Sequence, residues 1–187
     1  MITIHSPADE RTVRNLELGQ VVHIDGTIIT GRDEMHMRAL SSKNVPKELN
    51  FATLFHCGPI MIRDGKEWKA IAAGPTTSAR MDTMEAEMIE RFKIRIIIGK
   101  GGMSDDVLKA MKDNGCVYLA AIGGAAVSLA ECLRCTGIEW EELGMAEAMW
   151  KFTAKQFGPL VVAMDAHGNS LYKNVGSKVN RTIKDHS

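Results

Sequence analysis

The sequence predicts an α/β protein in which helices flank a mixed sheet. The clearest evidence is a β-α-β pattern, in which the apolar run Ile96–Ile98 and the β-rich run Cys116–Ala121 have the length of buried strands. Between them, Ser104 can cap a helix that Gly115 ends. A second observation is Asp64-Gly65, which favours a tight hairpin between the β-rich runs on its two sides. Crossover helices and hairpins together indicate both parallel and antiparallel strand pairs.

Length and composition favour one domain. The chain has 187 residues, 45% of them hydrophobic, and no linker rich in Pro, Gly or Ser divides it. We expect one domain over residues 1–187, with a loosely ordered polar tail at residues 173–187. The 23 Lys and Arg balance the 23 Asp and Glu, which argues against nucleic acid or an anionic membrane as a partner. No apolar run approaches the roughly 20 residues of a membrane span and no signal peptide is evident, so we expect a cytoplasmic protein.

The first third of the chain predicts two helices around a β-rich run. Ser6, followed by Pro and an acid, predicts a helix that runs to about Glu17. Residues 21–29 are β-rich, and Asp25-Gly26 within them predicts a turn, although one continuous strand with a bulge is an open alternative. Asp33 predicts the start of the second helix.

The middle of the chain predicts strands that lead into a helix. Phe51–Phe55 is a predicted strand, and the hairpin pairs Ile60–Arg63 with Trp68–Ala73. Asp82 is predicted to cap the next helix, with Glu85 three residues later closing a capping box. The expected apolar face of this helix consists of Met84, Met88, Ile89 and Phe92.

The last third predicts two helices and a final strand. Gly123-Gly124 should lead into a helix that contains Cys132 and Cys135, where a C-x-x-C pair is explained by helix packing better than by redox or metal chemistry. The run from Trp140 to Phe152 predicts a short helix, and Leu160–Met164 predicts the last strand.

Three cations share one local pattern. Arg32, Arg80 and Lys100 each follow an apolar strand and lie beside glycine or another small residue, where a ligand can approach the backbone. If the three converge, they form a pocket for two carboxylates; the alternative is that they are separate surface charges. The stretch from Gly74 to Asp82 supports an anion site, because a turn before a helix presents free backbone N–H groups. The Gly-Lys-Gly-Gly segment lacks the spacing of a phosphate-binding loop.

Three histidines are candidates for site residues. His36 lies four residues after Arg32, so both can face the same way, although a helical histidine beside Leu40 is as often a packing residue. His56, in the segment Phe-His-Cys-Gly-Pro, and His167 are most simply turn residues.

Seven motifs resemble one known family in their sequence and order: TGRDEMH, FHCGPIM, GPTTSARMD, IGKGGM, AAIGGAA, ELGMAEAMW and FGPLVVAMDAHGN. They resemble the β subunit, or C-terminal domain, of the class I iron-sulfur hydro-lyases, fumarate hydratase and L(+)-tartrate dehydratase. The resemblance covers residues 16–172, and no single short motif carries it.

This resemblance implies a swivelling β/β/α domain and a partner α subunit that holds a [4Fe-4S] cluster, assembled as two αβ pairs. Thr76 matches the proposed catalytic base, and His36 is a candidate catalytic helper. The positions that match substrate-binding residues are Arg32, Thr77, Arg80 and Lys100. No metal ligand is expected from this chain, because a cluster requires several convergent thiolates and only Cys57 lies near the expected pocket.

The implied activity is the reversible hydration of fumarate to L-malate, a step of the tricarboxylic acid cycle. The β subunit is expected to be inactive without its α subunit. The alternatives are the β subunit of L(+)-tartrate dehydratase, whose spellings GKGGM and TTS this chain shares, and a stand-alone module that binds dicarboxylates.

Overall fold

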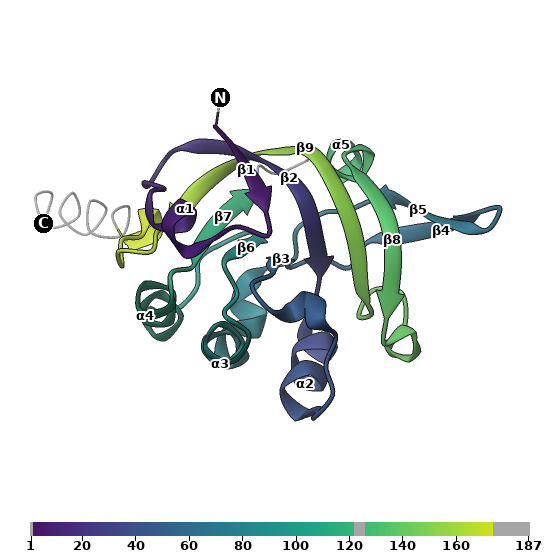
Figure 1. Cartoon of the computed structure of the whole chain (residues 1–187), viewed down its shortest axis with the longest axis horizontal. Helices are drawn as coiled ribbons and strands as arrows, with labels where there is room; N and C mark the ends of the chain where they lie inside the picture. The colour runs from purple at the N-terminus through teal and green to yellow at the C-terminus, as the bar shows by residue number, and fades with distance from the viewer. Residues whose placement is uncertain (1, 122–125, 174–187) are drawn as a thin grey trace, which may run out of the picture.

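A computed structural model describes residues 2–121 and 126–173 and confirms the predicted mixed sheet with flanking helices (Figure 1). The main sheet contains β1 (Ile2–Ser6), β2 (Val21–Thr30), β3 (Thr53–Phe55), β6 (Ile96–Gly99), β7 (Val117–Ala121), β8 (Leu133–Glu139) and β9 (Met149–Met164). A separate hairpin contains β4 (Ile60–Asp64) and β5 (Glu67–Ala72). The helices are α1 (Glu10–Arg14), α2 (Asp33–Ser41), α3 (Asp82–Phe92), α4 (Asp105–Asn114) and α5 (Ala126–Glu131). Three short 3-10 segments are η1 (Lys47–Leu49), η2 (Ser78–Met81) and η3 (Glu141–Leu143).

The main sheet closes on itself. Its strand order is β1-β2-β3-β6-β7-β9-β8, and β2 also pairs with β9. The neighbours β1, β2, β3, β6 and β7 are parallel, whereas β9 runs antiparallel to β2, β7 and β8. The extra β2–β9 pairing joins β2, β3, β6, β7 and β9 into a ring, which leaves few unpaired strand edges.

The alternation of side chains along the central strands divides the core in two. Ile96 and Ile98 of β6 point into a cluster enclosed by the strands, whereas Ile97 between them points into the layer beneath α2, α3 and α4. In β7, Leu119 likewise points into the enclosed cluster, and Tyr118 points into the layer beneath the helices. This period of two explains why both faces of these parallel strands are apolar. Figure 1 shows the three helices side by side along one side of the strands.

The strand β9 corrects the prediction of a helix from Trp140 to Phe152. Trp140 has a left-handed backbone (φ 55°) and is followed only by the three-residue η3. The strand of 16 residues that begins at Met149 includes the predicted strand Leu160–Met164. Within it, buried Phe152 and Ala154 alternate with exposed Thr153 and Lys155, so the period is that of a strand.

The N-terminal segment begins with a strand instead of a helix. Residues 2–6 form β1 beside β2, and the helix α1 begins only at Glu10. Its cap is Asp9, whose Oδ1 accepts a hydrogen bond from the backbone N–H of Thr12 at 2.7 Å. The predicted cap at Ser6 is therefore wrong, because the backbone of Ser6 continues the parallel ladder with Gly26.

The predicted turn at Asp25-Gly26 is also wrong, and the open alternative of a continuous strand with a bulge holds. The strand β2 runs unbroken from Val21 to Thr30, with register shifts against β9 around Ile24 and Gly26. Gly26 has φ 108°, and a Cβ at this position would lie 2.1 Å from the backbone oxygen of Ser6. A glycine is needed here because the two strands approach closely.

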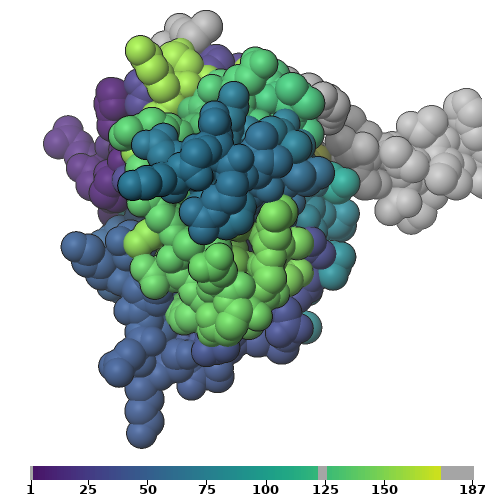
Figure 2. Space-filling view, turned by 90° about the vertical axis from the view of Figure 1, so that its right-hand side faces the viewer, coloured from purple at the N-terminus to yellow at the C-terminus, as the bar shows by residue number. Residues whose placement is uncertain are grey.

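The predicted hairpin is confirmed, and its inner face packs on the main sheet. Trp68 contacts Trp150 of β9, with ring centroids 5.2 Å apart. Arg63 stacks on Trp68, with its Cζ atom 4.0 Å from the ring centroid. The outer face carries Ile60, Ile62 and Ile71, which are exposed. Figure 2 shows the hairpin, in blue, lying in front of the green β8 and β9.

The segment with two cysteines is not one helix. The helix α5 ends at Glu131, Cys132 follows it, and Cys135 lies within β8; both thiols are free. The predicted Gly123-Gly124 turn and all of the predicted tail except residue 173 lie outside the described residues. Among the described helices, none combines the length and apolarity needed to cross a membrane.

We expect Gly26→Ala to destabilise the fold far more than Gly19→Ala. Gly19 has φ 82° and nothing lies within 4 Å of a Cβ added there, so alanine costs about 1 kcal/mol of backbone strain. At Gly26 the added methyl meets backbone that cannot move aside, and we expect a loss of about 3 kcal/mol or more. Urea unfolding of both variants measures the difference. Equal losses would show that β1 can move away from β2.

Candidate functional site

Three loops of the site follow neighbouring parallel strands. Arg32 lies two residues after β2, His56 directly after β3, and Lys100 directly after β6. The strands are adjacent in the order β2-β3-β6 and parallel, so their carboxyl ends meet at one edge of the sheet. Loops at this edge of an α/β sheet are where such folds commonly bind ligands.

The segment from Gly74 to Arg80 is hydrogen-bonded to the other loops. The backbone N–H of Thr76 donates to the backbone oxygen of His56 at 2.7 Å, and the N–H of Ser78 donates to the oxygen of Lys100 at 3.1 Å. Thr77 forms an isolated parallel bridge with Lys100. The structure therefore brings Thr76, Thr77 and Lys100, which are predicted site residues, into one place.

Arg32 directly precedes α2, and the side chain of Arg80, in η2, contacts the first residue of that helix. Arg80 donates from Nη2 to Oδ2 of Asp33 at 2.8 Å, and Asp33 is the residue after Arg32. The side chain of Arg32 runs past Gly58, where a Cβ would lie 3.0 Å from its Cδ and Nη1. Its Nε lies 3.3 Å from Oε1 of Glu147, an ion pair without a hydrogen bond from that nitrogen. Sequence reasoning did not predict either carboxylate partner.

The three predicted cations differ in their partners. Arg32 is paired with Glu147 and Arg80 with Asp33, whereas within the described residues Lys100 has no ion pair. The side chain of Arg80 is 53% exposed, so its pairing with Asp33 is weak and an incoming carboxylate can compete for it. This arrangement can bind a small organic anion.

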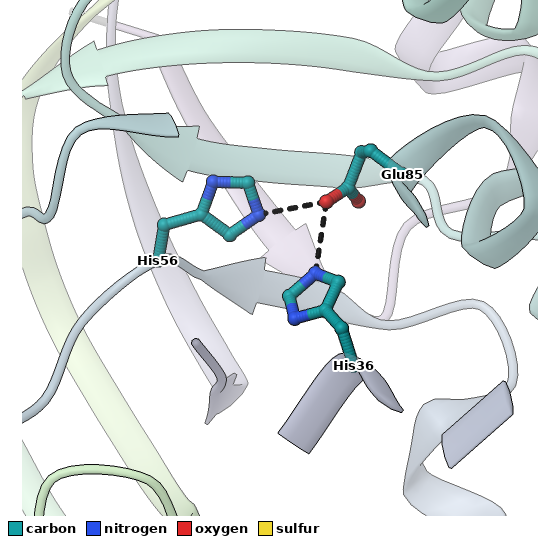
Figure 3. Close-up of side chains that lie close together, drawn as sticks. All are labelled: His36, His56 and Glu85. Carbon is teal, nitrogen blue, oxygen red and sulfur yellow. Dashed lines mark hydrogen bonds and ion pairs between the residues drawn. The ribbon is translucent and has the colours of Figure 1, made fainter. Parts of the chain in front are cut away.

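A buried cluster of His36, His56 and Glu85 lies beneath these loops, and all three side chains are fully buried (Figure 3). The Oε2 atom of Glu85 is 2.9 Å from Nε2 of His36 and 3.0 Å from Nε2 of His56. The three residues come from α2, the loop after β3, and α3. One carboxylate oxygen therefore joins two helices to the end of a strand.

The partners of each ring nitrogen decide where the protons are. The Nδ1 atom of His36 is 2.7 Å from the backbone oxygen of Arg32, which only accepts, so this nitrogen carries a proton. Burial raises the pKa of Glu85, but the electrostatic attraction of the two histidine rings and their hydrogen bonds outweigh burial and lower the pKa to about 2. Glu85 is therefore ionised, and both imidazoles donate to it from Nε2.

The two histidines differ in charge. Burial lowers the pKa of each ring; for His36 the attraction of Glu85 outweighs burial and the pKa is raised, whereas for His56 burial prevails and the pKa is lowered. His36 is thus the imidazolium of the cluster. His56 is neutral, and its Nδ1 accepts from the hydroxyl of Ser78 at 2.9 Å.

The cluster continues through two hydroxyls. The Oγ atom of Ser78 accepts from the hydroxyl of Tyr118 at 2.8 Å. Gly99 leaves room for this contact, because a Cβ there would lie 2.0 Å from Oγ of Ser78 and 2.8 Å from the hydroxyl of Tyr118. The glycine before Lys100 therefore allows the buried network to approach the β6 backbone.

Two sequence predictions at this site are corrected. Glu85 does not close a capping box, since its carboxylate is inside the protein, and the residue before the helix is Met81. Asp82 is the first residue of α3, and its Oδ1 accepts from the backbone N–H of Ser104 at 2.8 Å. His36 cannot touch a ligand in this conformation, because it is fully buried and both its nitrogens are bonded.

The cluster has residue types that bind transition metals, and its three ligand-type atoms lie within 4.8 Å of one another. Both Nε2 atoms, however, point to the same carboxylate oxygen at hydrogen-bond distance. That oxygen occupies the position that an ion would need in order to bind both rings. The geometry is that of a hydrogen-bonded cluster.

The cysteines of this chain do not fit an iron-sulfur cluster. They lie on different elements: Cys57 after β3, Cys116 before β7, and the pair at Cys132 and Cys135 at the start of β8. Burial raises the pKa of the Cys57 and Cys116 thiols, which disfavours the thiolate that iron binds.

Comparisons with known proteins cover nearly the whole chain. The family described as Fumarase C-terminus matches residues 1–175. A putative L(+)-tartrate dehydratase subunit beta from Methanocaldococcus jannaschii is 42% identical over 182 residues, covering 94% of this chain and 93% of that protein. A putative fumarate hydratase class I from Geobacillus stearothermophilus is 44% identical, covering 94% of this chain but 34% of that protein. The L(+)-tartrate dehydratase subunit beta of Escherichia coli is 35% identical, covering 89% and 84%.

We expect acid to destabilise the protein through Glu85. Its pKa is lowered from 4.5 to about 2 on folding, so the stabilisation is present above pH 4.5 and is lost as the pH falls towards 2. His36 has the opposite sign: its stabilisation is full below pH 6.5 and is lost as the pH rises through its raised pKa.

The measurement is the free energy of unfolding between pH 5 and pH 2 for the natural protein, Glu85→Gln and the exposed control Glu87→Gln. The natural protein and Glu87→Gln should lose stability in parallel, because both protonate Glu85 on unfolding in acid. Glu85→Gln should lose stability over a different range of pH, to which its buried neutral histidines contribute. Three parallel curves would contradict an ionised Glu85.

Proposed function

Because the chain belongs to the Fumarase C-terminus family of hydro-lyase subunits, we propose that it is the β subunit of an enzyme that reversibly hydrates fumarate to L-malate. The observation that carries this proposal is the meeting of the Arg32, Thr76 and Lys100 loops at one edge of the sheet. A flat dicarboxylate presents a negative charge at each end, and cations on separate loops can bind both ends. The chain spans about a third of the fumarate hydratase that it matches.

In this proposal, Arg32, Arg80 and Lys100 bind the substrate carboxylates. Hydration or dehydration next to a carboxylate passes through a state in which that carboxylate gains negative charge. Cations that are already in place stabilise this state more than the ground state, and such groups accelerate the chemical step. Thr77, whose backbone is bridged to Lys100, is proposed to contact the same substrate.

Thr76 is proposed as the base that exchanges the proton on carbon. An aliphatic hydroxyl loses its proton with difficulty at neutral pH, so Thr76 requires an acidic neighbour to relay the proton. We propose that the partner subunit supplies this group, since the two carboxylates near the site, Asp33 and Glu147, are paired with arginines.

The partner is proposed to be an α subunit that carries a [4Fe-4S] cluster, in an assembly of two αβ pairs in the cytoplasm. The relatives named as beta subunits support such a partner. A cluster with an open iron site would supply the Lewis acid that binds the leaving hydroxyl. This chain contributes substrate binding and the base, and we expect no turnover from it alone.

A second candidate substrate is L(+)-tartrate, because two of these relatives are named for tartrate dehydratase. Tartrate differs from malate by one more hydroxyl, and its binding requires a polar group at that position. A third candidate, a stand-alone module that binds dicarboxylates, uses the same cations without turnover.

The test of substrate is a panel of fumarate, L-malate, mesaconate and L(+)-tartrate. We expect the anaerobically reconstituted αβ complex to turn over fumarate and L-malate, and either chain alone to turn over none. Turnover of tartrate alone would favour the second candidate. If the complex has an intact iron-sulfur cluster but turns over no substrate, and this chain binds dicarboxylates, the binding module would be favoured.

We expect Arg80→Ala to lower kcat/KM of the complex by about 100-fold, because it removes a charge that the developing carbanion requires. The matched control is Arg38→Ala, which removes another ion-paired arginine, 2.9 Å from Glu142. Circular dichroism should show that both variants fold. A normal rate for Arg80→Ala would remove Arg80 from the site.

A further inference from the structure

Each loop with a proposed substrate contact is hydrogen-bonded to the buried cluster or to its immediate extension. The backbone oxygen of Arg32 accepts from His36, and the backbone oxygen of His56 accepts from Thr76. The N–H of Ser78, whose side chain bonds to His56, donates to Lys100. The bonds that reach the loops therefore come from His36, His56 and Ser78.

The two imidazoles meet at one atom. The Oε2 atom of Glu85 accepts from Nε2 of both His36 and His56. The opposite nitrogen of the His36 ring faces the Arg32 loop, and that of the His56 ring faces Ser78 in the Thr76 loop. Moving the carboxylate would therefore move two site loops together, and through Ser78 it would affect the third.

We propose that Glu85 is a positioning residue of the substrate site: through His36 and His56 it fixes the spacing between the loops that carry Arg32, Thr76 and Lys100. The expected effect of Glu85 on turnover rests on the proposed function. Its geometric part, the coupling of the three loops, does not depend on which substrate is bound.

The position of Glu85 in α3 argues against a role in stability alone. Met88, Ile89 and Phe92 follow it by three, four and seven residues, so Glu85 occupies the same buried face of the helix. Burying an ion pair costs free energy that well-packed apolar residues at the same place would not require. Its Oε1 atom has no hydrogen-bond partner among the described residues, which is a further cost. These costs are explained if the carboxylate is needed to hold His36 and His56 in position.

A glutamine does not carry the charge that strengthens this cluster. His36 needs two protons to donate to both Arg32 and Glu85, and the negative charge of Glu85 stabilises the doubly protonated ring. In Glu85→Gln the ring becomes neutral, and a hydrogen bond between two neutral groups at its Nε2 is about half as strong. The loops should then move relative to one another, and catalytic sites tolerate displacements of only about 0.5 Å.

The first experiment measures amide hydrogen exchange in the full chain and does not depend on activity. In Glu85→Gln, we expect the amides of Gly31, Thr76 and Ser78 to exchange at least tenfold faster relative to the amides of the β6–β7 ladder. In the control Glu87→Gln, an exposed site on the same helix, this ratio should be unchanged. An unchanged ratio in Glu85→Gln, including uniform acceleration of all amides, would overturn the proposal.

The second experiment measures KM and kcat of the αβ complex. We expect Glu85→Gln to raise KM for the dicarboxylate at least tenfold without lowering the amount of folded complex. In Glu85→Asp, the rise in KM should be smaller. A normal KM would overturn the effect on the site. If the natural complex is inactive on the whole substrate panel, the proposed function fails, whereas the exchange ratio still decides the positioning role.

A milder variant keeps the test decisive if Glu85→Gln does not fold. Ser78→Ala removes only the hydroxyl that His56 and Tyr118 share. We expect faster exchange at Thr76 and Ser78 but not at Gly31, because the bond from His36 to Arg32 remains. Equal acceleration at all three amides, or none, would contradict the coupling through His56.

Discussion

The fold around the site depends on one buried negative charge. Glu85 is fully buried and ionised, and it is stabilised because two imidazoles donate to the same oxygen atom. In a low-dielectric interior such bonds are strong and a displaced charge is costly, so the groups that surround it are held in place. These groups belong to two helices and a strand end, which explains how short loops from distant parts of the chain share one geometry.

The sheet supplies the second constraint. Since β2, β3 and β6 are parallel neighbours, the loops that follow them emerge at the same edge. The segment from Gly74 to Arg80 then crosses this edge and is bonded to two of these loops through backbone groups. Backbone bonds of this kind do not depend on side-chain identity, so Thr76 and Thr77 remain free to contact a ligand. Asp33 and Glu147 offset part of the charge of the arginines.

The chemistry that we propose is divided between two chains. The groups described here can bind an anion and hold protons, whereas the four cysteines lie on separate elements and the two most buried thiols resist ionisation. In the proposed reaction a Lewis acid would bind the leaving hydroxyl, and we assign that part to the partner. In this proposal, the edge of the sheet that carries the Arg32, Thr76 and Lys100 loops is the surface where the two subunits complete one site.

The sequence by itself determined those turns and helix ends that depend only on the backbone preferences of neighbouring residues. The hairpin at Asp64-Gly65, the cap at Ser104 and the end of α4 at Gly115 follow from backbone preferences that need no distant partner. The recurrence of a cation after an apolar strand likewise placed Arg32 and Lys100 in loops at the same edge of the sheet, after β2 and β6. Only the tertiary structure decided the long strand β9, because its partners are β2, β7 and β8.

The same distinction holds for Glu85. Its spacing to Met88, Ile89 and Phe92 placed it on the buried face, yet a capping box explained the same residue locally. Sequence determined that an acid would lie on α3 near the site loops. Tertiary structure decided that it would be buried and charged, because the two histidines that stabilise it come from 49 and 29 residues earlier in the chain.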